Sequence, residues 1–436
     1  MRPVAVVLTL GCKLNLADSE EIGRGLRAAG YEVVDRLCEA QAYVLNTCSV
    51  THVADAKSRG LIRSVRRLAP EALLTVTGCY PQSAGFEVAA QLGADLVVGM
   101  RDADKTALLD FLALHASGER PLEERGSQPL RPHTRAFIKA QEGCNDVCAF
   151  CIVPQTRGRE QSRSIERVVL EVAAAVEAGA REVVITGTQL GAWGRDLDPS
   201  LKPHHLIAAL LERTEVTRLR FSSLQPQDIS PELLALWHDP RLMPHFHLAL
   251  QSGSESTLSA MRRRYTARQF LQASERIHGA VPGVAITTDV IAGFPGESEA
   301  DFDDTLRVCE AAGFARMHCF PYSQRSRTRA ARMAAQTTHA ERKERMGRLL
   351  ELNERLSLAF RSRFEGTIRP VLWESPKQTA DGPSAHGHTD NYIPVYLLST
   401  DHQYTNGMDL RNRVMPVTLG AVYDDGVRGH FPGRLA

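Results

Sequence analysis

The sequence lacks an apolar run that is long enough to cross a lipid bilayer. A spanning helix needs about 20 consecutive apolar residues, and the apolar runs of this 436-residue chain are all much shorter. The apolar N-terminal stretch continues from Leu10 into Gly11-Cys12-Lys13 without the small-residue cleavage site of a signal peptide. These absences exclude a helical membrane protein, and we expect a cytoplasmic protein whose first strand is buried.

The chain also lacks an even set of cysteines and a strong excess of charge. Its nine cysteines are an odd number in a long chain, which argues against the disulfide framework of a secreted protein. A formal net charge of +1 neither supports nor excludes an RNA partner. Basic residues do cluster at 57–67, 157–163 and 262–264, and together these clusters suggest a surface for a polyanion.

One loop concentrates the chemistry of the chain. Cys144, Cys148 and Cys151 follow Gly143, and the Asn-Asp pair after Cys144 favours a tight turn. Thiolates bind zinc or an iron–sulfur cluster. A structural zinc site needs four ligands, and no histidine or fourth cysteine follows at ligand spacing. Three ligands leave one metal position open, which suits an iron–sulfur cluster that binds a substrate. A zinc knuckle or three buried cysteines are the alternatives.

The first 120 residues alternate short apolar strands with helical stretches, which predicts a parallel α/β sheet. One helix is expected to begin near Ala17, with Asp18 among the acidic residues of its first turn. Cys12, Cys48 and Cys79 each follow directly after a predicted strand. Because the carboxyl ends of parallel strands form the ligand crevice of such a sheet, these thiols are expected to form a second metal site. The alternative is three unrelated buried cysteines.

The region from about residue 131 to 360 predicts a partial barrel. It follows a polar linker, Ser117–His133, and its strands alternate with helices, so the site should lie at the carboxyl ends of the strands. The expected strands are Ala136–Gln141, Glu182–Thr186, Arg218–Ser222, His245–Leu250, Ala285–Ile291 and Ala315–Phe320.

The remaining histidines and the C-terminal part complete the sequence-based picture. We expect structural roles for four histidines, because none has an evident carboxylate partner: His133, His245, His247 and His318.

After an Arg- and Glu-rich helix, short strands between Gly-, Asp- and Asn-containing turns predict a small β-barrel. These strands are expected near Thr367–Trp373, Tyr392–Leu397, Val414–Leu419 and Gly426–His430.

The Cys-x3-Cys-x2-Cys spacing of the loop resembles the signature of the radical S-adenosylmethionine (SAM) superfamily. This resemblance implies that Cys144, Cys148 and Cys151 are catalytic and hold a 4Fe–4S cluster, with SAM on the fourth iron. It also implies that the loops after the barrel strands contact SAM. The implied cofactor-binding residues are Phe150, Thr186, Gly187, Gln251, Gly293 and Gly296.

The segments Thr9–Asn15 and Asn46–Thr51 resemble the N-terminal domain of the methylthiotransferases. In that family the matching cysteines, here Cys12, Cys48 and Cys79, hold an auxiliary 4Fe–4S cluster whose open iron carries or receives sulfur. Lys13, Thr51–Arg59 and Leu190–Gly194 most resemble the branch that acts on threonylcarbamoyladenosine in tRNA. The C-terminal strands, with the turn Gly387–Tyr392, resemble the TRAM domain, an RNA-binding β-barrel.

The resemblance implies an α/β fold in three domains. These are a flavodoxin-like methylthiotransferase domain (1–120), a partial (β/α)6 radical SAM barrel (131–360) and a TRAM-like barrel (364–436). The implied activity adds a methylthio group at C2 of N6-threonylcarbamoyladenosine next to the anticodon. The implied cofactors are two 4Fe–4S clusters and SAM.

The implied partners are a tRNA anticodon stem-loop, an electron donor such as flavodoxin or ferredoxin, and a sulfur source, with no membrane. Isopentenyladenosine in tRNA and an aspartate of a ribosomal protein are alternative substrates. An RNA-binding protein with structural metal sites is the alternative from another class.

Overall fold

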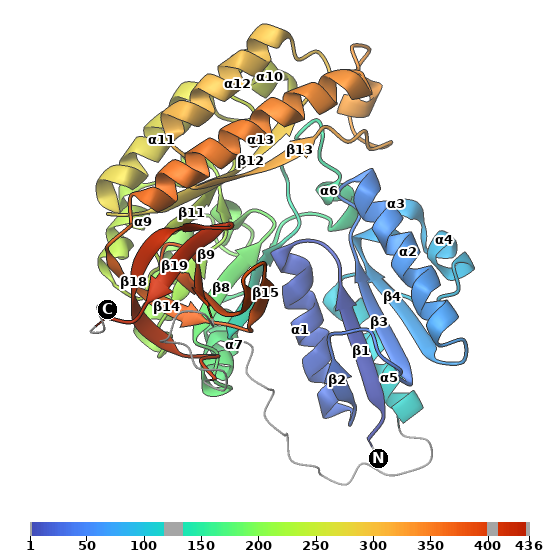
Figure 1. Ribbon diagram of the computed structural model, residues 1–436. Coiled ribbons are helices and arrows are strands. Elements are labelled where there is room, and N and C mark those ends of the chain that lie inside the picture. Colours follow the sequence, from blue (N-terminus) through green and yellow to red (C-terminus); the bar gives the residue numbers. More distant parts are fainter. Residues whose placement is uncertain (1, 117–133, 399–408, 433–436) are drawn as a thin grey trace.

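The computed structural model describes residues 2–116, 134–398 and 409–432. The blue N-terminal sheet lies on one side of the central green-to-orange strands, and the red C-terminal strands lie on another (Figure 1). The proposed linker Ser117–His133, including His133 itself, lies outside the described residues, and so do the proposed domain limits at 120 and 131. The strands of the described residues form four sheets, one in the N-terminal region, two in the central region and one in the C-terminal region.

Within residues 2–116, parallel strands form one sheet in the order β2-β1-β3-β4-β5. This is the strand order of flavodoxin-like folds, so the predicted fold class of this region is confirmed. The topological switch point lies between β1 and β3, where such sheets bind their ligands. The strands are β1 (Val4–Thr9), β2 (Glu32–Val34), β3 (Ala42–Thr47), β4 (Leu73–Gly78) and β5 (Leu96–Val97).

Helices cover this sheet and begin close to its carboxyl edge. The first of them starts at Lys13, one turn before the predicted start near Ala17, because Cys12 is already its N-cap. Leu14 and Ile22 lie on its buried face, which is the spacing of an amphipathic helix. The helices are α1 (Lys13–Ala28), α2 (His52–Leu68), α3 (Cys79–Ala84), α4 (Phe86–Gln91) and α5 (Asp102–Ala116).

The central strands form the expected partial barrel from two half sheets, β7-β6-β8-β9 and β10-β11-β12-β13. All neighbours are parallel except β6 and β7. The N–H of Leu219 donates to the carbonyl of Arg241 (2.7 Å) and links the halves. The strands are β6 (Arg135–Glu142), β7 (Gln161–Ser162), β8 (Glu182–Gly187), β9 (Leu219–Phe221), β10 (Ser223–Leu224), β11 (His245–Leu248), β12 (Ala285–Ala292) and β13 (Arg316–Pro321).

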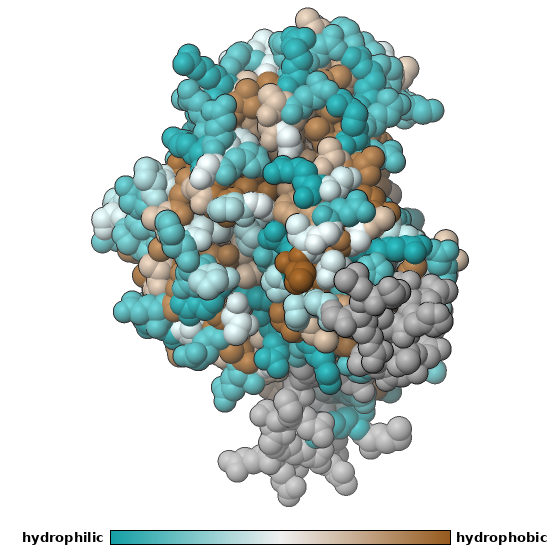
Figure 2. All heavy atoms as spheres, turned by 60° about the vertical axis from the view of Figure 1, so that its left-hand side comes forward, coloured by the Kyte–Doolittle hydropathy of each residue, from teal (hydrophilic) through white to brown (hydrophobic). Residues whose placement is uncertain are grey.

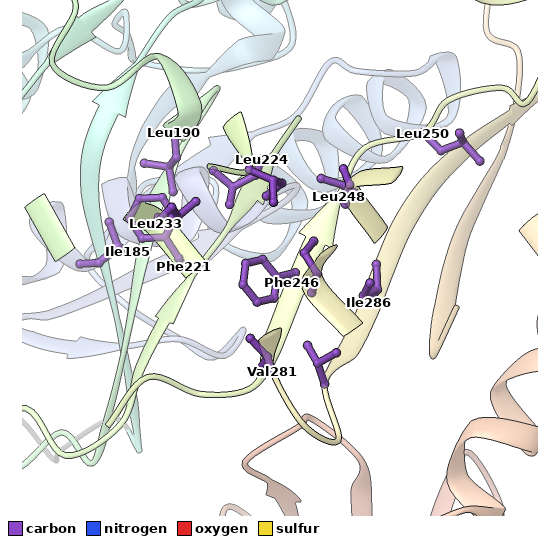
Figure 3. Close-up of a cluster of buried hydrophobic side chains, with 14 of the residues drawn as sticks. Ile185, Leu190, Phe221, Leu224, Leu233, Phe246, Leu248, Leu250, Val281 and Ile286 are labelled. Carbon is purple, nitrogen blue, oxygen red and sulfur yellow. The ribbon is translucent and has the colours of Figure 1, made fainter. Parts of the chain in front are cut away.

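The core of the barrel lies between the strands and the outer helices. Figure 3 shows Phe246, Leu248 and Ile286 in this core, where all three are buried. Since side chains alternate along a strand, the neighbouring residues His247 and Thr287 face the inside of the barrel. The larger outer helices are α7 (Ile165–Glu177), α8 (Pro203–Arg213), α11 (Ala267–Ala280), α12 (Glu299–Ala312) and α13 (His339–Ser362).

Shorter helices lie in the loops that connect these elements. They are α6 (Val153–Thr156), η1 (Leu190–Ala192), η2 (Pro226–Asp228), α9 (Pro231–Ala235), η3 (Leu236–His238), α10 (Glu255–Ala260) and η4 (Ala330–Arg332).

The C-terminal strands close into a barrel, because β14 pairs with β18 on one side and with β16 on the other. The sequence predicted four of these strands and missed β15 and β16. The expected turn Gly387–Tyr392 begins inside β16. The strands are β14 (Ile368–Trp373), β15 (Lys377–Thr379), β16 (Gly382–Thr389), β17 (Pro394–Leu398), β18 (Val414–Tyr423) and β19 (Gly426–His430).

This small barrel packs against the end of the central barrel where the strands begin. Glu182, the first residue of β8, is fully buried and pairs with Arg135, Arg218 and Arg220. The last two arginines also donate to the carbonyl of Thr389 in β16 (3.2 and 3.0 Å). The opposite end of the central barrel, where its strands finish, is therefore the end that remains for a site.

The visible surface is mixed in character. Figure 2 shows hydrophilic residues over most of this face, with hydrophobic ones scattered among them. In the described part of the chain, no helix combines the length and apolarity that a membrane crossing requires.

Candidate functional site

The first cysteine group lies in the loop that follows β6. Gly143 has a φ of 71°, and a Cβ there would lie 2.0 Å from the carbonyl oxygen of Arg159, so the loop requires glycine at this point. Beyond it, Cys144, Cys148 and Cys151 line one cavity of about 170 Å³ at the carboxyl end of the barrel. The structure thus brings the three predicted thiols together.

Each of these sulfurs accepts a hydrogen bond. The donors are the N–H of Asp146 to Cys144 (3.3 Å), the N–H of Val153 to Cys151 (3.4 Å) and the guanidinium of Arg263 to Cys148 (3.3 Å). Such donors stabilise thiolates and tune cluster sulfurs, so the residues present fit a 4Fe–4S cluster. Burial raises the pKa of Cys144 to about 11 and that of Cys151 to about 12. Metal binding must therefore displace protons.

The rest of the cavity wall combines apolar and polar side chains. Of the residues predicted to contact SAM, Phe150 and Gln251 line the cavity. The wall also includes Thr188, Gln189, Gln225, Arg263 and Asp289. Apolar surface with a few polar and charged groups, beside three thiols, suits a cofactor such as SAM, which has both an adenine ring and charged groups.

The other residues predicted to contact SAM are not among those that line this cavity. Thr186 is buried within β8, and Gly187 packs against Gln141. The loop of Gly293 and Gly296 lies against the segment before α13: the hydroxyl of Thr337 donates to the Gly293 carbonyl (2.6 Å), and the Gly296 N–H donates to the carbonyl of Ala335 (2.8 Å). Contact of these four residues with SAM stays a prediction.

Sequence reasoning missed two residues beside the cysteines. The side-chain oxygen of Gln189 lies 3.1 Å from the sulfur of Cys144, and its place in a turn after a predicted strand was the available signal. Arg263 was assigned to a basic surface cluster, and this was wrong, because its guanidinium contacts Cys148 within the cavity. Arg157 was assigned in the same way, although its side chain is only 3% exposed.

The second cysteine group lies at the carboxyl edge of the N-terminal sheet. Cys12 follows β1, Cys48 follows β3 and Cys79 follows β4, so the group includes the switch point. Gly11 has a φ of 113°, and a Cβ there would lie 3.0 Å from the sulfur of Cys48. The thiol of Cys79 interacts electrostatically with both other thiols. The three thiols predicted to meet therefore do lie together.

The surroundings of this group also suit a cluster. Backbone N–H groups of Ser49 and Val50 hydrogen-bond the thiol of Cys48, and Cys12 sits at the N-cap of α1, the positive end of the helix dipole. Burial raises the pKa of Cys79 to about 11. Three thiols with these donors fit a 4Fe–4S cluster that keeps one iron open.

Arg157 connects the two cysteine groups. It follows α6, a few residues after Cys151, and its guanidinium hydrogen-bonds the thiol of Cys79 in the other group. The same guanidinium donates to Asp18 (3.2 Å) on α1 and to Glu142 on β6. The second cysteine group therefore lies beside the segment that directly follows the first group in the chain.

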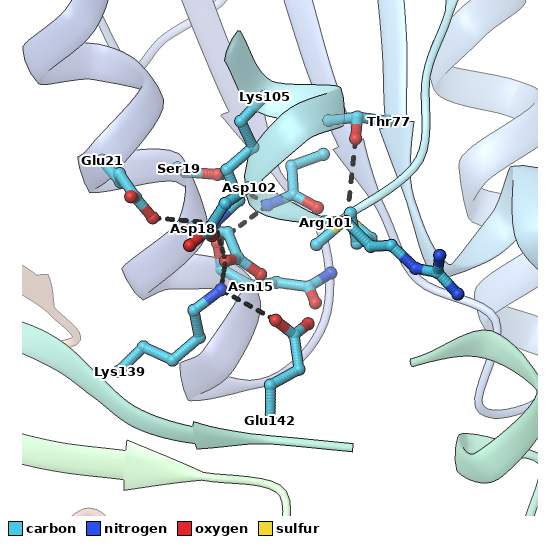
Figure 4. Close-up of polar contacts among 12 residues, drawn as sticks. Asn15, Asp18, Ser19, Glu21, Thr77, Arg101, Asp102, Lys105, Lys139 and Glu142 are labelled. Atoms are coloured by element: carbon cyan, nitrogen blue, oxygen red, sulfur yellow. Dashed lines mark hydrogen bonds and ion pairs between the residues drawn. The ribbon is translucent and has the colours of Figure 1, made fainter. Parts of the chain in front are cut away.

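A buried ionic network fixes the N-terminal sheet to the barrel beside this arginine. Figure 4 shows Lys105 and Lys139 reaching Asp18 from opposite sides, at 2.7 and 2.8 Å. Burial alone would raise the pKa of Asp18, but the charges of Lys139, Arg157 and Lys105 outweigh it and hold this pKa well below its usual range. Asp18 is fully buried, so the network stabilises one arrangement of the two sheets.

A second contact closes the space from the other side. Arg325, after β13, pairs with Asp55 on α2 (2.7 Å) and donates to the hydroxyls of Ser49 (2.9 Å) and Ser83 (3.1 Å). Ser49 is the residue after Cys48. The loop after β13 is therefore held against the second cysteine group.

The inside of the barrel contains a histidine with a carboxylate partner, contrary to the expectation from sequence. The Nε2 atom of His247 on β11 lies 3.3 Å from Asp289 on β12. His318 on β13 is paired in register with Asp289. Asp289 also lines the cavity of the first cysteine group.

Family models match two parts of the chain. Residues 5–99 match "Uncharacterized protein family UPF0004", and residues 138–309 match the "Radical SAM superfamily".

The chain is also similar in sequence to curated proteins. One is the threonylcarbamoyladenosine tRNA methylthiotransferase MtaB of Bacillus subtilis, with 36% identity over 96% of this chain and 94% of that protein. Another is the tRNA-2-methylthio-N(6)-dimethylallyladenosine synthase of Syntrophomonas wolfei, with 35% identity over 95% and 94%. Among solved structures, the radical SAM methyltransferase TsrM of Kitasatospora setae matches with a TM-score of 0.50 and 15% identity, over 74% of this chain and 75% of that one. At that identity it shows the fold alone.

Proposed function

The chain belongs to the family of radical SAM tRNA methylthiotransferases, and on that premise we propose that it adds a methylthio group to C2 of N6-threonylcarbamoyladenosine next to the anticodon of tRNA. Relatives of the threonylcarbamoyl and dimethylallyl branches match with similar identity. The choice of substrate is therefore supported by the local resemblance of Lys13, Thr51–Arg59 and Leu190–Gly194 to the threonylcarbamoyl branch.

The observation that carries the proposal is the pair of cysteine groups, which Arg157 links because it follows the first group in the chain and reaches Cys79 in the second. Both groups lie at the carboxyl edge of a parallel sheet, and each has three thiols. When bound, the two 4Fe–4S clusters and SAM supply radical cleavage of SAM on one side and sulfur on the other. A base whose C2 atom lies between the two groups can meet both activities without leaving the site.

Within the barrel, the residues of this chain hold the cysteine loop in place. The N–H of Ala149 donates to the carbonyl of Met261 (2.9 Å), and the carbonyl of Ala149 accepts from the N–H of Ala330 (2.8 Å). Arg263 compensates negative charge at Cys148. Gln251 also lines the cavity and offers an amide group for the polar parts of SAM, whereas the amide of Gln225 donates to Asp146 (3.2 Å) and accepts from Arg263 (3.2 Å).

Around the second group, the chain keeps the reacting space closed. Arg157 on one side and Arg325 on the other fasten the N-terminal sheet over the open end of the barrel. Exclusion of water matters because a reactive radical must not be quenched before it meets its substrate.

The remaining assignments concern the partners of the protein and its location in the cell. We assign RNA binding to the C-terminal barrel together with the mouth of the central barrel, with the base splayed out of its loop as is usual for single-stranded RNA. An electron donor such as flavodoxin or ferredoxin and a sulfur source complete the reaction. A tRNA substrate implies action in the cytoplasm.

Mass spectrometry of tRNA nucleosides tests the substrate most directly. A strain that lacks this gene should accumulate threonylcarbamoyladenosine and lose its methylthio derivative, and the intact gene should restore it. Loss of the methylthio derivative of isopentenyladenosine instead would contradict the proposed branch. Unchanged nucleosides, together with no deoxyadenosine from SAM in vitro, would favour an RNA-binding protein with structural metal sites.

A further inference from the structure

The inner face of the barrel contains a group of polar side chains that the radical chemistry leaves unused. His247, Asp289 and His318 come from three neighbouring strands, β11, β12 and β13, and their ligating atoms all lie within 4.8 Å of one another. His247 is buried, whereas His318 remains exposed. The Nδ1 atom of His247 also lies 3.1 Å from the hydroxyl of Thr287. These partners hold the imidazole of His247 in one orientation.

The charges around this group favour an anionic ligand. Two histidines and a carboxylate are also a ligand set for a divalent metal. However, the ammonium of Lys13 at the start of α1 interacts electrostatically with both Asp289 and His318, and Arg316 acts on His318 as well. Positive charge from outside the group disfavours a second cation and attracts a negatively charged group. The group therefore suits a carboxylate better than a metal ion.

The group also lies beside the cavity of the first cysteine group. Asp289 is shared, because it belongs to this group and also lines the cavity of Cys144, Cys148 and Cys151. In adenine, C2 and the C6 atom that carries N6 flank the same ring nitrogen. A base with C2 in the radical cavity therefore has its N6 substituent close by, within reach of Asp289 and its neighbours.

We propose that Lys13 and His318 bind the free carboxylate of the threonylcarbamoyl group, while Asp289, which His247 holds in place, accepts a hydrogen bond from the hydroxyl or N–H groups of the substrate. This inference rests on the proposed function. An isopentenyl group has no charge and no polar atom, so it would leave these side chains without partners. A site built for polar contacts rejects an analogue that lacks them, and the group thus determines specificity between the two tRNA substrates.

Binding of synthetic anticodon stem-loops to the full-length, anaerobically reconstituted protein tests this inference. Fluorescence anisotropy without reductant measures affinity in the absence of turnover. The probes are one RNA with threonylcarbamoyladenosine and the same RNA with a carboxamide in place of the carboxylate. The wild type should prefer the acid by about tenfold or more, as expected for a charge-assisted hydrogen bond.

Two variants should remove this preference. Lys13→Met and His318→Gln are each expected to bring the ratio of the two affinities close to one. Lys13→Met removes the positive charge that attracts the carboxylate, and His318→Gln removes the imidazole N–H that donates to it. Unchanged iron content of Lys13→Met would show that the neighbouring Cys12 still holds its cluster, and His318→Gln gives an answer at a distance from both cysteine groups. The matched control is Lys57→Met on α2, whose lysine is exposed. It should weaken both RNAs alike and keep the ratio.

Three results would overturn the inference. The first is a wild type that modifies threonylcarbamoyladenosine but binds acid and amide equally. The second is a preference that survives in both variants. The third is stoichiometric binding of Mn²⁺ or Zn²⁺ by the wild type that His318→Gln abolishes, since this would make the group a metal site. Methylthiolation of an isopentenyladenosine stem-loop alone would instead overturn the proposed function itself.

Discussion

The two cysteine groups are built in different ways. Cys144, Cys148 and Cys151 belong to one short loop, whose own turns and hydrogen bonds set the positions of the sulfurs. The other three thiols come from loops after three different strands, and only the parallel sheet brings them together. A local site is recognisable from spacing, whereas a site that depends on topology is recognisable only once the strand order is known.

The largest expected effect is the loss of SAM cleavage, the reaction step that we assign to the first cysteine group. Cys148→Ala removes a ligand of the first cluster, so cleavage of SAM to deoxyadenosine should fall to background. Chromatography of deoxyadenosine after anaerobic incubation with reductant measures this. Cys319→Ala is the matched control, because Cys319 is partly buried and lies outside both groups. Normal deoxyadenosine production by Cys148→Ala would contradict the assignment.

The corresponding change in the second group should give the complementary result. Cys48→Ala is expected to retain cleavage of SAM and to lose formation of the methylthio nucleoside, because only the sulfur-bearing cluster is disturbed. Parallel assays of deoxyadenosine and of the modified nucleoside, on the same preparation, test the division of labour. If both products disappeared together, the two groups would not be separable in function.

The next effect in size is a loss of folding stability, which we expect when the ionic network around Asp18 is disrupted. Asp18→Asn leaves Lys105 and Lys139 buried without their shared carboxylate. Loss of one partner from a buried ion pair typically costs about 3–5 kcal/mol, so urea unfolding of the cluster-free protein should show a decrease of that order. Asp110→Asn, at an exposed position on α5, should change the free energy of unfolding little. An unaffected Asp18→Asn would mean that the network does not fix the two sheets.

The same network predicts an acid dependence. The pKa of Asp18 in the folded protein lies below its ordinary value of 3.8. Its contribution to stability is therefore fully present above that value and is lost as the pH falls toward the folded pKa. The wild type should lose more stability than Asp18→Asn between pH 5 and pH 3, which urea unfolding at several pH values can measure. Equal losses of stability in the wild type and in Asp18→Asn would contradict the role given to Asp18.

The smallest expected effect concerns Arg157, which links the segment after the first cysteine group to the second group. Arg157→Lys keeps the positive charge but loses the planar fork that reaches Asp18, Glu142 and Cys79 at once. We expect cleavage of SAM to continue, with formation of the methylthio nucleoside lowered by about tenfold, the equivalent of one lost charge-assisted contact. A variant with an unchanged ratio of the two products would show that Arg157 does not couple the groups.

Much of this arrangement could be predicted from the sequence. A cysteine directly after an apolar, strand-like run must lie at the carboxyl edge of a parallel sheet, so the pattern around Cys48 and Cys79 is enough to place both thiols. Six of the central strands follow from their regular alternation with helices, whereas the two-residue strands β7 and β10 were not predicted. The close spacing of Cys144, Cys148 and Cys151 is enough to identify the first cysteine group from the sequence.

Other features could not be predicted, because they depend on contacts between distant elements. Asp18 reads as an ordinary acidic residue in the first turn of a helix, yet it pairs with a lysine from β6. His247 and Asp289 lie far apart in the sequence, and only the register of neighbouring strands brings them within 3.3 Å. Basic clusters read from sequence as an RNA surface included Arg157 and Arg263, which the structure assigns to the interior of the site.

The iron content of the anaerobically reconstituted protein tests the central claim most directly. Two groups that each hold a 4Fe–4S cluster predict about eight iron ions and as many sulfides per chain. Cys48→Ala and Cys148→Ala should each retain about half of this amount. A wild type that binds only about four iron ions would contradict the account, because one of the two groups would then hold no cluster.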